Sequence, residues 1–232
     1  MITVASYNMH KGIGTDRQAM PERILQVLAG IDADIVTLQE ADQRFGKRAA
    51  VLSRTLLDRF GWAPVTFGAR PASMGWHGNL MLLRKDMTVV DQTAIPLPSL
   101  EPRGAIMADV RTRHGQQLRI VGMHLDLSGL RRTRQAQAII AQITSRPQPL
   151  PTILMGDLNE WSATTGCLHE FARHYRIAET GPSFHARRPV ARLDRIMVSR
   201  DLKIAACGVE TGKLAKVASD HLPIWARIEG VR

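Results

Sequence analysis

Cysteine is nearly absent from this chain of 232 residues, which contains only Cys167 and Cys207. So small a number excludes a disulfide-stabilised scaffold, and we expect both thiols to be reduced in a cytoplasmic protein. No segment reaches the roughly 18 consecutive apolar residues that a membrane-spanning helix needs. The opening residues, MITVASYNMH, lack the basic and apolar regions of a signal peptide and have the pattern of a strand instead.

Linkers rich in proline, glycine or serine, low-complexity tracts and internal repeats are also lacking, so residues 1–232 are predicted to form a single domain. Hydrophobic residues make up 44% of the chain, which is enough for a substantial core. Acidic residues are the minority, with 21 Asp and Glu against 31 Lys and Arg and a net charge of +10. This charge favours anionic partners such as nucleic acid, phosphorylated substrates or acidic lipid surfaces, although a merely solvated surface would have the same composition.

Short apolar runs alternate with helical patterns along the chain. Apolar residues at helical spacing predict helices over residues 21–31, 48–60 and 130–144. Strands are predicted over residues 2–8, 34–40, 77–84, 87–95, 104–112, 117–125, 152–159, 193–199 and 221–229. The four consecutive strands between residues 77 and 125 predict hairpins, so the pattern favours a layered α/β domain with mixed sheets over a doubly wound one.

Polar side chains stand at the boundaries of many of these strands. They are Asn8, Glu40, His124, Asp157 with Asn159, Asp194, and Asp220 with His221. Carboxylate and amide oxygens are ligands that Mg²⁺ or Mn²⁺ prefers, and histidines suit acid/base or phosphate-stabilising roles. Strand alternation would put Asp157 and Asn159 on one face. Each residue alone also has a structural explanation, such as a turn at Asn8, an Asx turn at Asp157–Asn159 or a helix cap at Glu40.

The order of the motifs SYNMHKG, DIVTLQE, HGNLMLLR, GMHLDLSGLRRTRQAQ, ILMGDLNEW, RLDRIMVS and SDHLPI resembles the endonuclease/exonuclease/phosphatase superfamily, in particular its compact bacterial metal-dependent hydrolases. The resemblance extends from about residue 3 to residue 227. The fold that it implies is a four-layer α/β sandwich, with two mixed β-sheets packed face to face and helices outside. It also implies a divalent metal cofactor, Mg²⁺ or Mn²⁺.

The resemblance further implies roles for individual residues. Asn8, Glu40 and Asp220 would belong to the metal site, and Asp157 would orient or deprotonate the attacking water with Asn159 as its partner. His124 and His221 would face the phosphate, with Asp194 orienting His221. Asn79, Arg103 and Arg134 would contact the substrate.

These assignments predict a metal-dependent phosphoesterase, with nucleic acid as the first expectation for the substrate of a phosphodiesterase. Two alternatives stay open: hydrolysis of a phospholipid head group or small phosphate ester, and a basic binding module without catalysis. We expect a monomer with an anionic, phosphate-containing partner, and contact with a membrane surface is left open. The chain lacks a long insertion that could wedge into DNA.

Two arginine-rich stretches and one aromatic have alternative interpretations. The segment RRTR places Arg131, Arg132 and Arg134 in the first turns of a helix, where cations oppose the helix dipole. A bound phosphate would offset that cost; we favour simple solvation for the first two arginines and a site role for Arg134. The segment HARRPVAR could be a basic rim or a solvated loop, and Trp76 could stack on a substrate or anchor a loop.

Overall fold

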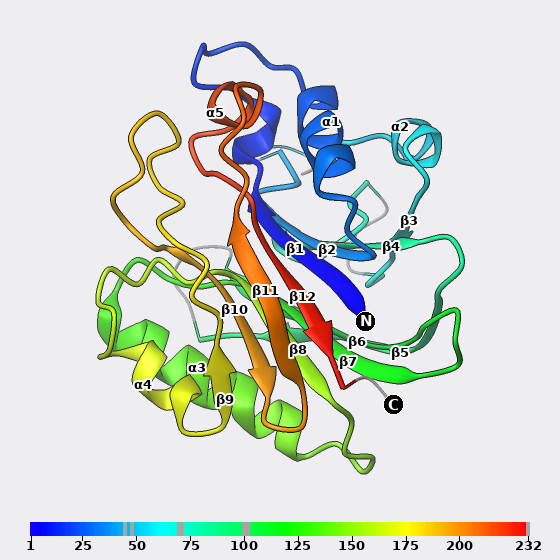
Figure 1. Ribbon diagram of the computed structural model, residues 1–232, viewed down its shortest axis with the longest axis vertical. Helices are drawn as coiled ribbons and strands as arrows, with labels where there is room; N and C mark the ends of the chain where they lie inside the picture. Colours follow the sequence, from blue (N-terminus) through cyan, green and yellow to red (C-terminus); the bar gives the residue numbers. More distant parts are fainter. Residues whose placement is uncertain (44–45, 47–48, 69–71, 99–102, 231–232) are drawn as a thin grey trace.

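The computed structural model describes residues 1–43, 46, 49–68, 72–98 and 103–230, and its strands form two six-stranded sheets (Figure 1). From edge to edge, the first sheet contains β11 (Lys203–Val209), β12 (Ile224–Glu229), β1 (Ile2–Asn8), β2 (Ile35–Gln39), β4 (Leu80–Arg84) and β3 (Trp62–Val65). The second contains β5 (Thr88–Pro96), β6 (Gly104–Arg111), β7 (Gln117–His124), β8 (Thr152–Asp157), β10 (Asp194–Ser199) and β9 (Tyr175–Ile177). One parallel pair in each sheet, β1 with β2 and β7 with β8, makes both sheets mixed, as predicted.

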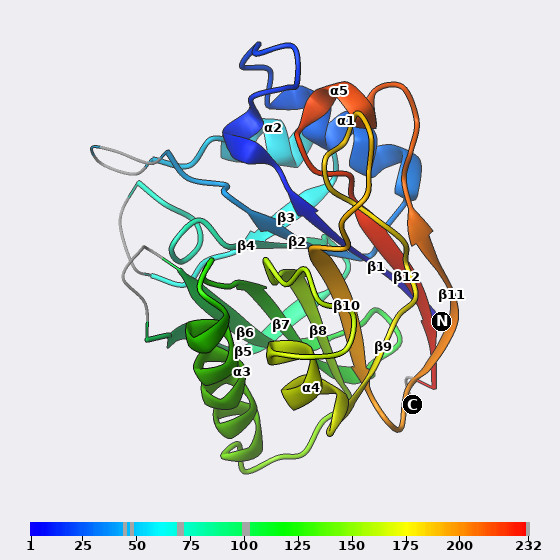
Figure 2. The ribbon, with the colours of Figure 1, turned by 90° about the vertical axis from the view of Figure 1, so that its left-hand side faces the viewer.

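The helices lie outside the two sheets and complete four layers (Figure 2). The outer face of the first sheet carries α1 (Glu22–Ile31), α2 (Arg54–Arg59) and α5 (Ala215–Ala218), with the short η1 (His10–Gly12) nearby. The outer face of the second sheet carries α3 (Gly129–Thr144) and α4 (Cys167–Ala172). One apolar cluster fills the space between the sheets, and another lies beneath each helical layer. The predicted α/β sandwich is therefore confirmed.

Strand alternation carries polar residues onto the inner face of the sandwich at one end. On β1, Val4 belongs to the core between the sheets, and Asn8, four residues later, shares its face. On β8, Ile153 and Met155 belong to the same core, and Asp157 continues their face. The inner side of each strand thus changes from apolar to polar toward its end, so the polar ends face one another across the seam between the sheets.

Hairpins are predicted through the four consecutive strands between residues 77 and 125, and the prediction is wrong for the first pair, β4 and β5. β4 pairs with β2 and β3 in the first sheet, whereas β5, β6 and β7 form the hairpins in the second sheet. The chain therefore changes sheets between β4 and β5. An alternating pattern shows that a segment has a buried face, but it does not identify the strand that lies beside it.

The helix predicted over residues 48–60 begins later than expected. The hydroxyl of Ser53 accepts the backbone N–H of Leu56 at 3.1 Å, and this N-cap starts α2 at Arg54. Before the cap, Ala50 forms an isolated bridge with Asp42, while residues 47 and 48 lie outside the described part. The sequence patterns also missed β3, β9, β11, α4 and α5.

Other expectations from the sequence agree with the structure. Both cysteines are free. In the described part of the chain, no helix has the length and apolarity needed to cross a bilayer. The other helices predicted from spacing, over residues 21–31 and 130–144, appear as α1 and α3 with nearly the same bounds.

Candidate active site

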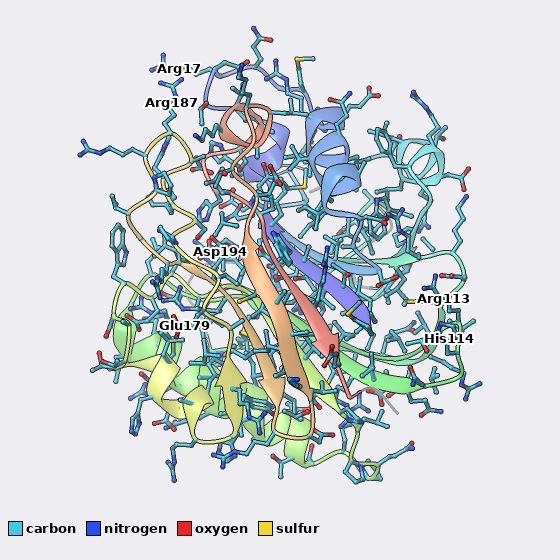
Figure 3. All side chains as sticks on the ribbon, viewed as in Figure 1. Arg17, Arg113, His114, Glu179, Arg187 and Asp194 are labelled. Carbon is cyan, nitrogen blue, oxygen red and sulfur yellow. The ribbon has the colours of Figure 1, made fainter. Side chains whose placement is uncertain are left out.

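The polar residues predicted at strand boundaries gather at one end of the seam between the sheets. In β7 and β8, His124 lies opposite Asp157, and in β8 and β10, Asp157 lies opposite Asp194. Asn8 ends β1 of the facing sheet, and His221 precedes β12 of that sheet. Figure 3 labels Asp194 at the start of β10. The two sheets therefore contribute jointly to one cluster.

Asp157 is at the centre of this cluster and is almost completely buried. Its Oδ2 accepts a hydrogen bond from Asn8 Nδ2 at 2.9 Å and lies 3.4 Å from His124 Nε2 and 3.8 Å from His221 Nε2. Burial penalises the carboxylate, but the charges of His221 and His124 and the bond from Asn8 outweigh it and hold the pKa of Asp157 well below its usual range. Asp157 is therefore an anion at neutral pH.

Asn8 and Asp157 each form the turn that the structural explanation predicted, and each also contacts the other within the cluster. Asn8 Oδ1 accepts the N–H of His10 at 3.1 Å, and Asp157 Oδ1 accepts the N–H of Asn159 at 2.9 Å. Both are Asx turns. In each residue one side-chain atom closes the turn, while the other joins the contact between Asn8 and Asp157. Forming a turn therefore does not remove either side chain from the site.

The expected placement of Asn159 by strand alternation is wrong. β8 ends at Asp157, and Asn159 has a left-handed backbone with φ of 51°. The turn, not the strand, therefore sets the direction of its side chain. Its Nδ2 donates to the carbonyl of Leu125 at 3.0 Å, which places Asn159 beside the segment that follows His124.

His221 and Asp194 form a buried hydrogen-bonded pair. His221 Nδ1 lies 2.8 Å from Asp194 Oδ2, which also accepts the hydroxyl of Ser183 at 2.5 Å. Although burial disfavours the imidazolium, the charges of Asp194 and Asp157 raise the pKa of His221 to about 10. Burial also raises the pKa of Asp194, against the opposing effect of His221. Asp194 therefore favours the imidazolium form of His221, and their 2.8 Å contact is a charge-assisted hydrogen bond when His221 is protonated.

Glu40 follows directly on β2 and reaches the site through a left-handed backbone with φ of 54°. The ammonium of Lys11 contacts its Oε2. Burial opposes ionisation, but the charges of His124, Lys11 and His10 outweigh it and lower the pKa of Glu40. Asp220 is half-buried, with Oδ1 3.9 Å from His10 Nδ1. Glu40 and Asp220 therefore both lie next to the segment that follows β1.

The donor types of the cluster suit a divalent cation. Ligating atoms of Asp157, Asp194 and His221 lie within 4.8 Å of one another in the described chain. Within this group, His221 Nδ1 and Asp194 Oδ2 already engage each other at 2.8 Å. The carboxylate of Glu40, which keeps its charge and is only half-buried, is the better hard ligand, and Asn8 is the amide nearest to Asp157.

The three predicted substrate contacts differ in their placement. The guanidinium of Arg103 contacts His124 Nε2, which brings it to the cluster. Asn79 is buried, donates to the carbonyl of Gly104 at 3.0 Å and thereby links β4 to β6, while its Oδ1 has no partner among the described residues. Arg134 is exposed on α3 and is not brought into the cluster by its position, so its role remains a prediction.

Sequence reasoning missed the importance of Arg132, for which solvation was favoured. Arg132 is buried, and its Nη2 and Nε lie 3.1 and 3.2 Å from Glu160 Oε2. Its Nη1 donates to the carbonyls of Asp126, at 3.3 Å, and Leu127, at 2.7 Å. Gln135, also buried, accepts the N–H of Asp126 at 2.9 Å. The i, i+3 spacing of Arg132 and Gln135 on one helix face was the available signal.

Arg132 thereby connects the segments that follow two of the site's strands. Leu127 comes three residues after His124 at the end of β7, and Glu160 comes three residues after Asp157 at the end of β8. Leu125 N–H also donates to the carbonyl of Asp157 at 2.9 Å. The first turn of α3 therefore braces the two segments that present His124, Asp157 and Asn159.

A second missed feature is an aromatic pair beside His221. The ring of Phe184 lies 4.8 Å from the ring of His221, and the ring of Trp161 meets Phe184 edge to face at 6.3 Å. Trp161 is 67% exposed, which is unusual for so large an apolar side chain and leaves its surface open next to the buried cluster.

Comparison with known proteins identifies the class of this fold and site. The sequence profile of the Endonuclease/Exonuclease/phosphatase family matches residues 5–221, and the chain belongs to that family. It is thus a hydrolase of this superfamily, whose enzymes use divalent metals. No curated protein sequence matches the chain.

Solved structures share the fold at low sequence identity. A functionally unknown conserved protein of Enterococcus faecalis V583 has a TM-score of 0.78 and 18% identity, covering 99% of this chain and 100% of that one. A mannosyl-6-phosphatase of Bacteroides thetaiotaomicron has a TM-score of 0.76 and 19% identity, covering 99% and 100%. TDP2 of D. rerio, complexed with a single-strand DNA product, has a TM-score of 0.71 and 18% identity, covering 98% of each chain.

Proposed function

We propose that this protein is a divalent-metal-dependent phosphodiesterase that directs water at phosphorus. The carrying observation is the buried Asp157 carboxylate, held by Asn8 at 2.9 Å beside the hydrogen-bonded His221–Asp194 pair. A carboxylate next to a histidine that a second carboxylate biases toward the imidazolium supplies the two functions that phosphate ester hydrolysis needs. These are orientation of a water and stabilisation of negative charge on phosphoryl oxygens.

The residues of the cluster have distinct roles in this proposal. Asp157 accepts a hydrogen bond from the attacking water and thereby orients it. His221, held by Asp194, donates a charge-assisted hydrogen bond to a phosphoryl oxygen. Asn159 and His124 line the same end of the seam, and Arg103 adds positive charge through its contact with His124.

Glu40 would hold Mg²⁺ or Mn²⁺, with Asn8 and Asp220 as neighbouring oxygen donors. When bound, such an ion neutralises charge on the phosphate without consuming a proton. The ammonium of Lys11 contacts Glu40, so a bound ion would share or displace that contact.

Nucleic acid is the proposed substrate class, and the net charge of +10 is the observation that favours it. A small phosphate ester is the second candidate. The structural neighbours include both TDP2 in complex with a single-strand DNA product and a mannosyl-6-phosphatase, so the shared fold is compatible with either class.

A substrate panel with matched variants tests the proposal. Single-stranded DNA, RNA, bis-p-nitrophenyl phosphate and p-nitrophenyl phosphate are incubated with and without Mn²⁺. We expect metal-dependent hydrolysis of diesters, and His221→Ala and Asp157→Ala should each lower kcat far more than they raise KM. His114→Ala is the control, because His114 is exposed at the turn between β6 and β7, far from the cluster (Figure 3). Near-normal kcat in either site variant would refute its assigned role.

A further inference from the structure

Three segments that are distant in sequence lie together beside the candidate site. They are residues 13–17, residues 184–191 and α5. The guanidinium of Arg187 donates to the carbonyl of Thr15. The backbone N–H of Thr15 donates to the carbonyl of Val217 at 2.9 Å. The hydroxyl of Thr15 also donates to the carbonyl of Lys216 at 3.1 Å. These bonds join the three segments, and Figure 3 labels Arg17 and Arg187 at the same edge of the molecule.

The surface of the three segments, together with Lys213 just before α5, is the basic wall, and it presents five exposed cationic side chains: Arg17, Arg187, Arg188, Lys213 and Lys216. Within the described residues, none of the five forms an ion pair at 4.0 Å or less. Two acids close to these segments in sequence are engaged elsewhere: Asp16 pairs with Arg23 at 2.7 Å, and Glu210 accepts the N–H of Gly212 at 2.7 Å. Clustered cations that lack acidic partners favour an external polyanion.

The basic wall is continuous with the reactive cluster. The N–H of Ala186 donates to the carbonyl of Asp220 at 2.7 Å, so the 184–191 segment is anchored directly to the residue before His221. From the same segment, Phe184 contacts the ring of His221 on one side and Trp161 on the other. A chain of phosphates on the basic wall would therefore lead past His221 to the exposed face of Trp161.

We propose that the basic wall and the Trp161–Phe184 pair form a binding track for single-stranded nucleic acid. This inference rests on the proposed phosphodiesterase function and specifies its substrate. A positively charged surface that follows the backbone, combined with an aromatic face for bases, is the combination that binds single strands. An anionic lipid surface could use both the charges and an exposed tryptophan, but the contact of Trp161 with Phe184, and of Phe184 with His221, favours a strand whose phosphates reach the cluster. Bases must also be unstacked to reach Trp161, which selects single strands over duplex.

Binding of a short fluorescent oligonucleotide, measured by anisotropy in Ca²⁺ across a salt series, tests the track. The double variant R187E/R188E is compared with R111E/R113E, which makes the same change in net charge at the far end of β6. β6 begins at Gly104, opposite His124, and ends at Arg111, so this control lies away from the site. Figure 3 shows Arg113 on the opposite side of the molecule from Arg187.

We expect R187E/R188E to weaken binding severalfold and to flatten the log–log salt slope by about 0.7 per lost phosphate contact, while R111E/R113E changes both much less. Trp161→Ala should raise Kd by roughly 5- to 150-fold, the range of one base–aromatic stack. Equal effects of the two double variants would show that only net charge matters and would overturn the track. Unchanged Kd in Trp161→Ala would overturn the aromatic part.

Two further measurements separate this inference from the proposed function. Failure of the wild-type protein to hydrolyse bis-p-nitrophenyl phosphate with Mn²⁺ would overturn the proposed function even if the oligonucleotide bound. Normal hydrolysis of that diester together with a flat salt response to the oligonucleotide would overturn the track alone. Loss of binding to phosphatidylglycerol vesicles in R187E/R188E, with oligonucleotide binding intact, would reassign the basic wall to a membrane surface.

Discussion

Replacing Arg132 by leucine should destabilise the protein strongly, because it leaves Glu160 buried without its cation. The two side chains are only 9% and 7% exposed, and both Nε and Nη2 of Arg132 reach the same Glu160 oxygen. The substitution also leaves the carbonyl of Leu127 without its 2.7 Å donor. Breaking a buried ion pair from one side typically costs about 3–5 kcal/mol. In a domain of this size, that corresponds to a fall in Tm of about 6–20 °C.

The matched control is Arg134→Leu, since Arg134 occupies the same helix and is exposed. Surface substitutions usually change stability by about 0.5 kcal/mol or less, so chemical denaturation should separate the two variants clearly. The double variant R132L/E160L removes both charges and should recover much of the loss. Equal unfolding free energies for Arg132→Leu and Arg134→Leu would refute the reasoning.

Arg132 should also affect turnover if it positions the segments after β7 and β8. Arg132→Lys keeps the charge but loses the fork that binds Glu160 and two carbonyls at once. We expect it to retain most of the stability and to lower kcat more than it raises KM, because Asn159 and His124 depend on those segments. Normal kcat in a folded Arg132→Lys protein would restrict Arg132 to a structural role.

Two further predictions concern ionised groups of the site. Glu40→Gln should abolish most Mn²⁺ binding in isothermal titration while the unfolding free energy is little changed, and unchanged affinity would remove Glu40 from the metal site. Because the pKa of His221 is raised to about 10, the stabilisation from its imidazolium is fully present below pH about 6.5 and is lost as the pH rises through about 10. The charge of Asp194 is the main cause of this raised pKa, so Asp194→Asn should lower the pKa of His221 and move the alkaline limb of kcat/KM to lower pH. An unshifted limb would contradict the assigned pairing.

Much of the fold could be predicted because many strands are short apolar runs with a polar residue at one boundary. These runs identified β1, β2, β8 and β10 and, through their polar ends, Asn8, Asp157 and Asp194. They could not assign β4 and β5 to different sheets, because alternation shows a buried face and not a partner. Chain order and resemblance, rather than periodicity, indicated the two-sheet architecture.

Strand periodicity does not predict the direction of a side chain where the backbone leaves the extended conformation. Glu40 and Asn159 both adopt left-handed backbones just beyond the ends of their strands, so their side-chain directions do not follow from the strand period. The preference for Arg134 over Arg132 came from the family resemblance and not from the packing of the helix. In an arginine-rich helical turn, composition is uniform, and only the packing against Glu160 shows which arginine is buried.

The geometry of the candidate site depends on the packing of the two sheets against each other. Asn8 belongs to the first sheet and Asp157 to the second, and their 2.9 Å contact spans the seam. His221 precedes a strand of the first sheet, yet its partner Asp194 begins a strand of the second. The core between the sheets, including Val4 and Met155, therefore fixes these distances. A large-to-small substitution in this core would leave a cavity and should loosen both contacts together. We therefore expect such a substitution to lower turnover before it unfolds the protein, although it lies well away from any substrate.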